Sequence, residues 1–300
     1  MTTPATKKAA PLWVGVLWML ACLVSFIAMA LASRELAQHM SIMQVLLLRS
    51  AVGIVIMLAV AHRVLPEMCK GIDLHLHVLR NLVHFSAQYC WTLAVVLLPL
   101  AYVFALEFTM PIWVALIAAL WLGERITRVR FMAMLVSFAG VLIILRPDAG
   151  LNAAAFLVLA AAAGYGASAV FVKRLTATCS PAVIVMWMVL MQCPMAALMM
   201  WFTTDWVVPS WLDAPWIVVL GVATLCAHYT MARALQIMDA SLAIPIDFLR
   251  VPLVAVIGWL YYGETIGAAV FVGAALIAGA NFFAMRAERP PHTRRRETQA

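Results

Sequence analysis

Four charged residues stand deep inside apolar stretches of the sequence: Arg49, Glu107, Asp247 and Arg250. Placing such a charge at the centre of a bilayer costs roughly 2.5–3.5 kcal/mol, so each must face a protein interior or a water-filled cavity. Two acids in such a place can bind a cationic or zwitterionic molecule, and a carboxylate there can also exchange a proton. The structural alternative is that each acid is a paired anchor, because Asp247 and Arg250 are three residues apart on one helix.

A second set of polar residues recurs at helical spacing within residues 77–97. Its members are Arg80, Asn81, His84, Gln88 and Trp91. These positions share one helix face, and the deeper ones cannot reach the headgroups, so protein or water must cover them. Residues 214–236 carry a matching stripe that includes His228. The pattern predicts that both segments line a cavity and contact its ligand; interhelical hydrogen bonds, worth about 0.6 kcal/mol each, are the structural alternative.

The chain contains an internal duplication, in which residues 87–146 return as residues 227–286 at a constant offset of 140. The recurring marks are Ala87-Gln88-Tyr89 with Ala227-His228-Tyr229, Glu107-Phe108 with Asp247-Phe248, and Gly123-Glu124 with Gly263-Glu264. Because the acids recur in register, we expect Glu107 and Asp247 to approach one central cavity from opposite sides. Internal duplication within a multi-pass membrane protein is typical of transporters whose site lies between the halves.

Composition places these residues in a membrane protein. Of 300 residues, 66% are hydrophobic and 11% charged, whereas soluble domains hold about 45–50% apolar and 25% charged residues. Stretches of about 20 apolar residues cross a bilayer, and they predict an all-α integral membrane protein of ten transmembrane helices. The predicted spans are 12–32, 42–62, 77–97, 100–121, 128–146, 151–172, 181–202, 214–236, 240–261 and 267–286.

The distribution of positive charge predicts the orientation. With the N-terminus in the cytoplasm, the outer side holds only Arg34 and Arg146 among lysines and arginines, in agreement with the positive-inside rule. Five spans per half is an odd number, so the two five-helix repeats must be inverted relative to each other. We therefore expect four segments, with both tails cytoplasmic: an N-terminal tail 1–11, repeats 12–146 and 151–286, and a basic C-terminal tail 287–300.

Other residues favour structural roles. Arg49 can bridge backbone carbonyls, although it could instead meet a substrate carboxylate. Glu124 and Glu264 end their spans at the membrane interfaces, and we interpret them as determinants of the fold. Prolines within membrane helices permit kinks; those in the fourth and ninth spans are Pro111, Pro245 and Pro252. The six cysteines form no pattern typical of a metal site, and we expect neither metal nor cofactor.

Arg49 in span two, a fourth span that ends in Leu122-Gly123-Glu124, and a ninth span that ends in Gly263-Glu264 together resemble the EamA-domain members of the drug/metabolite transporter superfamily. The resemblance implies alternating-access transport through a bacterial inner membrane. We expect export of a small polar or zwitterionic, amino-acid-like metabolite. The alternative is import of a nucleoside-like cofactor such as S-adenosylmethionine. A membrane enzyme is a distant alternative, because the short loops lack a catalytic cluster, so we expect no enzyme activity. We expect a monomer or homodimer in the bilayer, without nucleic acid.

The orientation predicts which positions a membrane-impermeant thiol reagent can reach. In a cysteine-free variant, Asp205→Cys should be labelled in intact cells, because residues 203–213 face outward. Arg295→Cys should be labelled only after the cells are opened. The reverse pattern would contradict the predicted topology.

Overall fold

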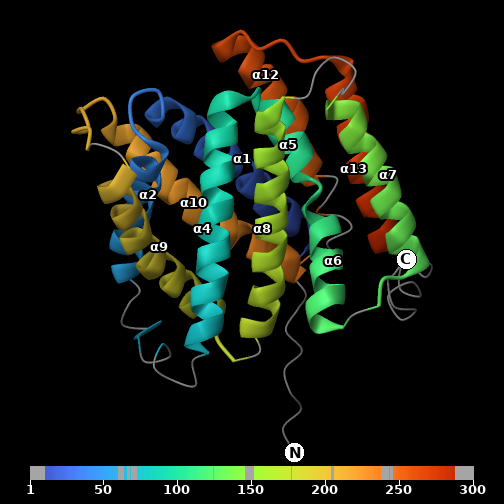
Figure 1. Cartoon of the computed structure of the whole chain (residues 1–300), viewed down its shortest axis with the longest axis horizontal. Coiled ribbons are helices and arrows are strands. Elements are labelled where there is room, and N and C mark those ends of the chain that lie inside the picture. Colours follow the sequence, from blue (N-terminus) through green and yellow to red (C-terminus); the bar gives the residue numbers. More distant parts are fainter. Residues whose placement is uncertain are drawn as a thin grey trace, which may run out of the picture.

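The computed structural model describes residues 11–59, 64–65, 68, 73–123, 125–145, 152–176, 178–203, 206–237, 243 and 246–287, and it holds helices and no strands within these residues. The helices pack as one bundle with their axes mostly along a common direction (Figure 1). Their bounds are α1 (Leu12–Leu36), α2 (Ile42–Leu58), α4 (Leu74–Leu97), α5 (Leu100–Glu107), α6 (Met110–Leu122), α7 (Arg128–Leu145), α8 (Ala153–Leu175), α9 (Pro181–Thr203), α10 (Ala214–Ile237), α12 (Arg250–Tyr262) and α13 (Ala268–Ala287).

Seven helical segments within the described ranges are long and apolar enough to cross a membrane. They are α1, α5 continued by α6, α7, α8, α9, α10 and α13. Helix α2 is apolar but shorter, with 17 residues, and α4 has the length of a span but carries the polar stripe. The protein is therefore an all-helical, multi-pass membrane protein, as its composition predicts.

The predicted fourth span is broken into two helices. Helix α5 ends at Glu107 and α6 begins at Met110, with Pro111 in the first turn of α6, where a missing N–H removes no helical hydrogen bond. The Asn281 side chain donates a hydrogen bond of 2.9 Å to the carbonyl oxygen of Phe108 at the break. Pro252 lies in the first turn of α12 in the same way, and Pro245 lies outside the described residues.

Several helices recur at the offset of the sequence repeat. Helices α4 and α10 begin and end 140 residues apart, and so do α6 and α12. Gly123 and Gly263 end the latter pair in the left-handed conformation, with φ of 69° and 62°, which favours glycine at a helix C-terminus. The sequence repeat is therefore also a repeat of local structure.

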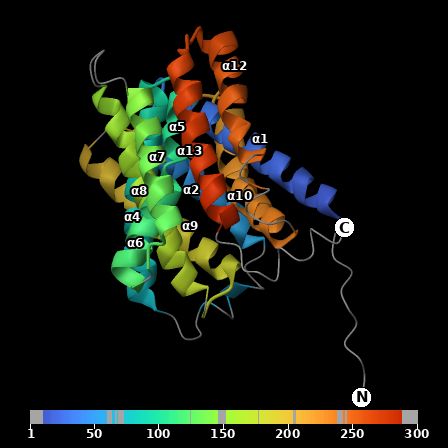
Figure 2. The same cartoon turned by 90° about the vertical axis from the view of Figure 1, so that its right-hand side faces the viewer.

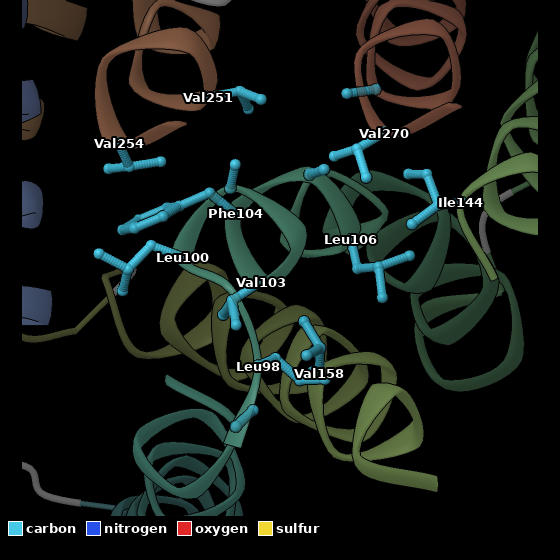
Figure 3. Close-up of a cluster of buried hydrophobic side chains, with 14 of the residues drawn as sticks. Leu98, Leu100, Val103, Phe104, Leu106, Ile144, Val158, Val251, Val254 and Val270 are labelled. Carbon is cyan, nitrogen blue, oxygen red and sulfur yellow. The ribbon is translucent and has the colours of Figure 1, made fainter. Parts of the chain in front are cut away.

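Helix α5, with eight residues, forms the centre of the largest apolar cluster among the described residues. Leu100, Val103, Phe104 and Leu106 are fully buried. They pack against valines and other apolar residues of α8, α12, α7 and α13, several of which Figure 3 labels around this helix. Because α5 ends at Glu107, this packing fixes the position of the Glu107 carboxylate within the bundle.

Two pairs of helices that correspond under the offset pack against each other in antiparallel directions. Gly140 of α7 lies against Gly273 of α13. Ala133, which precedes Gly140 on α7, packs with Ala280, which follows Gly273 on α13. Figure 2 shows the two helices side by side. Helices α2 and α9 also pack together, and Arg49 meets Gln192 while Gly53 lies against Val189. Partner numbers fall as residue numbers rise, so both pairs are antiparallel.

The close approach of α7 and α13 predicts a sharp difference between two glycine substitutions. A Cβ atom on Gly140 would lie 2.7 Å from the carbonyl oxygen of Gly273, whereas one on Gly279 would meet nothing within 4 Å. Gly140→Ala should therefore destabilise the purified protein by about 1–3 kcal/mol and lower its thermal unfolding temperature. Gly279→Ala should leave that temperature unchanged or raise it slightly. Equal unfolding temperatures would show that the two helices can move apart freely.

Candidate functional site

A cavity of about 300 Å³ opens at the centre of the bundle. Helices α1, α2, α4, α5, α6, α8 and α10 contribute its walls, so segments from both ends of the chain meet there. Its polar lining comprises Ser33, Arg49, Arg80, His84, Gln88, Trp91, Thr92, Glu107, Tyr165, Ser168, Thr224 and His228. The remaining walls are apolar, as is usual for a pocket that binds a small molecule.

One end of the cavity carries a carboxylate that belongs to a charged triad. The Trp91 indole N–H donates a hydrogen bond of 2.8 Å to Glu107 Oε2. Arg250 Nη1 lies 3.9 Å from Glu107 Oε1, and Arg250 Nη2 donates a hydrogen bond of 2.6 Å to Asp247 Oδ2. Arg250 is thus shared by two acids, one of which faces the cavity.

Aromatic rings enclose the guanidinium group of Arg250. Its central carbon lies 4.5 Å from the ring centre of Phe26, 5.3 Å from that of Phe104 and 5.4 Å from that of Phe108. Cation–π contacts of this kind strengthen when water is excluded. Two acids and three rings therefore hold this cation in place beside the cavity.

The other end of the cavity is cationic. Arg49 Nη2 donates hydrogen bonds to Oε1 of Gln88 and, at 3.1 Å, to Oε1 of Gln192. Arg80 Nη1 donates one of 2.8 Å to the Oδ1 of its neighbour Asn81. Within the described part of the chain, neither arginine forms an ion pair.

Histidine and tyrosine rings of three helices meet within the cavity lining. The ring of His84 is 5.3 Å from that of Tyr165 and 6.4 Å from that of His228, measured between centroids. His84 Nε2 is also 3.0 Å from Gln88 Nε2. The polar stripe of α4 thus meets residues of α8 and α10 across the cavity.

The structure places the sequence-predicted site residues in two groups. The cavity-lining group comprises Arg80, His84, Gln88, Trp91, Glu107 and His228. Asp247 and Arg250 stand behind the wall instead, and Arg250 reaches the cavity only through Glu107. Glu107, which has no partner on its own helix, obtains both of its partners from other helices.

The residues predicted to be structural occupy different places. Arg49 lines the cavity. Glu264 binds Arg34 of α1, and its Oε2 accepts a hydrogen bond of 3.0 Å from the Leu100 backbone N–H at the start of α5, so it joins three helices at one end of the bundle. Glu124 lies outside the described residues.

Tyr165 is a cavity residue that the sequence reasoning missed. It stands between Gly164 and Gly166, which allow α8 to approach Ala87 of α4 and Trp113 of α6 closely. A single aromatic residue between two glycines in a run of alanines was the available signal. Ser168 and Phe26 were missed because isolated residues of these types are common in membrane helices.

Comparison with known proteins identifies the family. A model described as the EamA-like transporter family matches residues 13–146 and again residues 152–286. The chain belongs to the EamA-like transporter family. The drug/metabolite transporters that this chain resembles in sequence are therefore its relatives, and the protein is a membrane transporter and not an enzyme.

Curated relatives of this EamA-like transporter carry small metabolites. It is 28% identical over 274 residues to a riboflavin transporter of Vibrio cholerae, covering 88% of this chain and 90% of the relative. It is 21% identical to an S-adenosylmethionine uptake transporter of Rickettsia felis (95% and 97% covered). It is 27% identical to the pseudopaline exporter CntI of Pseudomonas aeruginosa (88% and 93% covered).

A solved structure has the same fold. It superposes with a TM-score of 0.64 at 18% sequence identity, covering 92% of this chain and 99% of the other. The helical arrangement of this chain is therefore one that a solved structure also has.

The triad predicts that Arg250 stabilises the bundle of this EamA-like transporter. Arg250→Gln leaves two carboxylates without their shared cation, and loss of one partner of a buried ion pair costs about 3–5 kcal/mol. The variant should unfold at a clearly lower temperature, and adding Asp247→Asn and Glu107→Gln should restore part of the loss. Arg128→Gln, which changes an exposed arginine, is the control. A variant at position 250 that is as stable as the control would show that the triad contributes nothing.

Proposed function

We propose that this EamA-like transporter exports a small polar or zwitterionic metabolite of amino-acid type from the bacterial cytoplasm by alternating access. The observation that carries the proposal is the central cavity, which is lined by a carboxylate, Glu107, that contacts Trp91 and by two arginines, Arg49 and Arg80, that contact residues earlier on α4. A zwitterion can place its cationic group near the first and its anionic group near the second.

The architecture that we propose consists of ten spans in two inverted five-helix repeats, with both termini in the cytoplasm. Two adjacent family-model matches, 13–146 and 152–286, support the repeat. Helices that correspond under the offset, α7 with α13 and α2 with α9, run antiparallel where they pack, which is expected of inverted units. Rocking of one such unit against the other would expose a cavity between them to each side in turn.

Import of a nucleoside-like cofactor is the second candidate. The walls of the cavity include Phe26, Trp91 and Tyr165, and aromatic side chains of this kind stack on flat heterocyclic rings. A nucleoside or a flavin would use these surfaces more fully than a short aliphatic amino acid would. The two candidates differ in direction, so one measurement separates them.

Metabolite profiling tests the function and its direction together. Bacteria that express the chain are compared with cells that carry an empty vector, and metabolites in cells and medium are measured by mass spectrometry. Export predicts that a zwitterionic metabolite leaves the cells faster when the chain is present. Faster depletion of a nucleoside-like compound from the medium would favour import. No difference in either direction would contradict both candidates.

We further propose that Glu107 couples export to proton entry. The charged groups nearest to this carboxylate are Arg250 and Asp247, and Trp91 and Tyr165 also face it. A proton on Glu107 removes its attraction for a cationic substrate group, so entry of a proton favours release of the substrate. We propose no proton exchange at Asp247, which pairs with Arg250 at 2.6 Å and does not line the cavity.

Proteoliposomes test this coupling with a metabolite that the profiling identifies. Wild-type transport should increase with an imposed proton gradient opposed to the substrate flux. Glu107→Gln cannot exchange a proton and should lower transport at least tenfold, with no remaining response to the gradient. Glu107→Asp retains a carboxylate and serves as the matched control. Wild-type transport that ignores the gradient would leave Glu107 only a role in substrate binding.

A further inference from the structure

The two arginines that line the cavity have no counter-charge within the part of the chain that the structure describes. Arg49 and Arg80 are 7% and 6% exposed, and no carboxylate pairs with either among the described residues. Among the described residues, Arg49 donates side-chain hydrogen bonds only to the neutral amide oxygens of Gln88 and Gln192. Within the same residues Arg80 donates one, to the amide oxygen of Asn81, and its Nε atom has no partner.

Two other arginines of the bundle, Arg250 and Arg34, show how such a charge can be compensated. Arg250 is shared by Asp247 and Glu107, and Arg34 pairs with Glu264. Removing a charge from water is costly unless an opposite charge accompanies it. Arg49 and Arg80 lack such a paired carboxylate among the described residues, and both of them line the cavity.

Additional hydrogen-bonding atoms converge on the same end of the cavity. His84 lies within electrostatic range of both arginines, and its Nδ1 atom is buried without a partner. The amide of Gln88 links Arg49 to His84, so the three side chains are held in one connected group. Apart from the histidine ring nitrogen, whose role depends on its tautomer, the unpartnered atoms here are donors.

We propose that Arg49 and Arg80, with His84, form a subsite for an anionic group, a carboxylate or a phosphate, of the transported molecule. The proposal rests on the proposed function, since it assigns one end of the transport cavity to one part of the substrate. Guanidinium groups suit both anions, because their N–H donors match the spacing of the oxygens. The subsite favours a molecule that bears an acid over a neutral molecule of the same shape.

The acid group also fixes how the rest of the substrate lies. With the anion at Arg49 and Arg80, the body of the molecule extends along Tyr165 and Trp91 toward Glu107, all of which line the same cavity. A cationic group at the far end then meets the carboxylate. A neutral heterocycle would leave both buried arginines uncompensated.

Matched pairs of small probes test the subsite on the full-length purified protein. Thermal unfolding is measured with benzoate against benzamide, and with inorganic phosphate against chloride at equal ionic strength. Benzoate reports carboxylate binding, and phosphate reports phosphate binding. We expect at least one anion to raise the unfolding temperature by several degrees in a saturable manner, whereas benzamide and chloride should not.

Variants assign the effect to the two arginines. Arg49→Gln and Arg80→Gln should each weaken the apparent affinity for the effective anion at least tenfold, whereas Arg128→Gln, at an exposed position, should not change it. Arg80→Lys keeps the charge and should retain part of the effect. If a glutamine variant does not fold, the subsite is tested by the wild-type protein alone, through the comparison of benzoate with benzamide and of phosphate with chloride.

Two results would overturn the subsite: wild-type protein that responds to neither anion, or glutamine variants that respond as strongly as wild type. Either result leaves the transport proposal standing, because metabolite profiling does not depend on these probes. Conversely, if an anion raises the unfolding temperature but profiling finds no transported metabolite, the subsite is supported and the transport proposal is contradicted.

Discussion

A charge buried in a bilayer needs a partner, and the arrangement of this protein follows from how its buried arginines meet that need. Arg250 shows the requirement fully met: Asp247 and Glu107 share it, and the rings of Phe26, Phe104 and Phe108 surround it. These contacts join α1, α5 and α12 at the centre of the bundle. The core around α5 is apolar and tightly packed, so it holds Glu107, the last residue of α5, in a fixed position beside Arg250. Arg49 and Arg80 have no paired carboxylate within the described residues, and these two arginines line the cavity.

Helices that correspond under the sequence repeat share their bounds but not their charged residues. The acids correspond, since Glu107 and Asp247 are 140 residues apart, and so do the glycines that end α6 and α12. The cations do not: the position that corresponds to Arg250 is Met110, and the position that corresponds to Arg80 is Leu220. The recurring glycines therefore mark where helices terminate. The arginines that occur in only one copy of the repeat make the charges around the cavity asymmetric. On the proposed function, this asymmetry is what would orient a substrate in the cavity.

The sequence predicted most of the helices, and the polar stripe of α4, because these depend on local patterns. Apolar length, glycine at a C-terminus and helical spacing act over a few residues, and the predicted bounds of α4 and α10 differ from the observed ones by at most three residues. The partners of Glu107 could not be predicted in the same way. Arg250 is 143 positions away in the chain, and only packing of α5 against α12 brings the two together. The break at Phe108 and the place of Tyr165 likewise depend on Asn281 and on close helix approach, which no local pattern encodes.

The charges around the cavity also suggest why an acid-bearing substrate and a proton would act at opposite ends. Arg49, Arg80 and Arg250 carry three positive charges and Glu107 and Asp247 two negative ones, so these five described side chains sum to +1 when both acids are ionised. A bound anion compensates the end at which cations exceed acids. On the proposed mechanism, a proton and the cationic group of the substrate compete for Glu107 at the other end, because one carboxylate cannot satisfy both. Exchange then needs no large rearrangement of the charged groups. On this proposal the ion pair of Asp247 and Arg250 stays intact during the exchange, because neither of these residues lines the cavity.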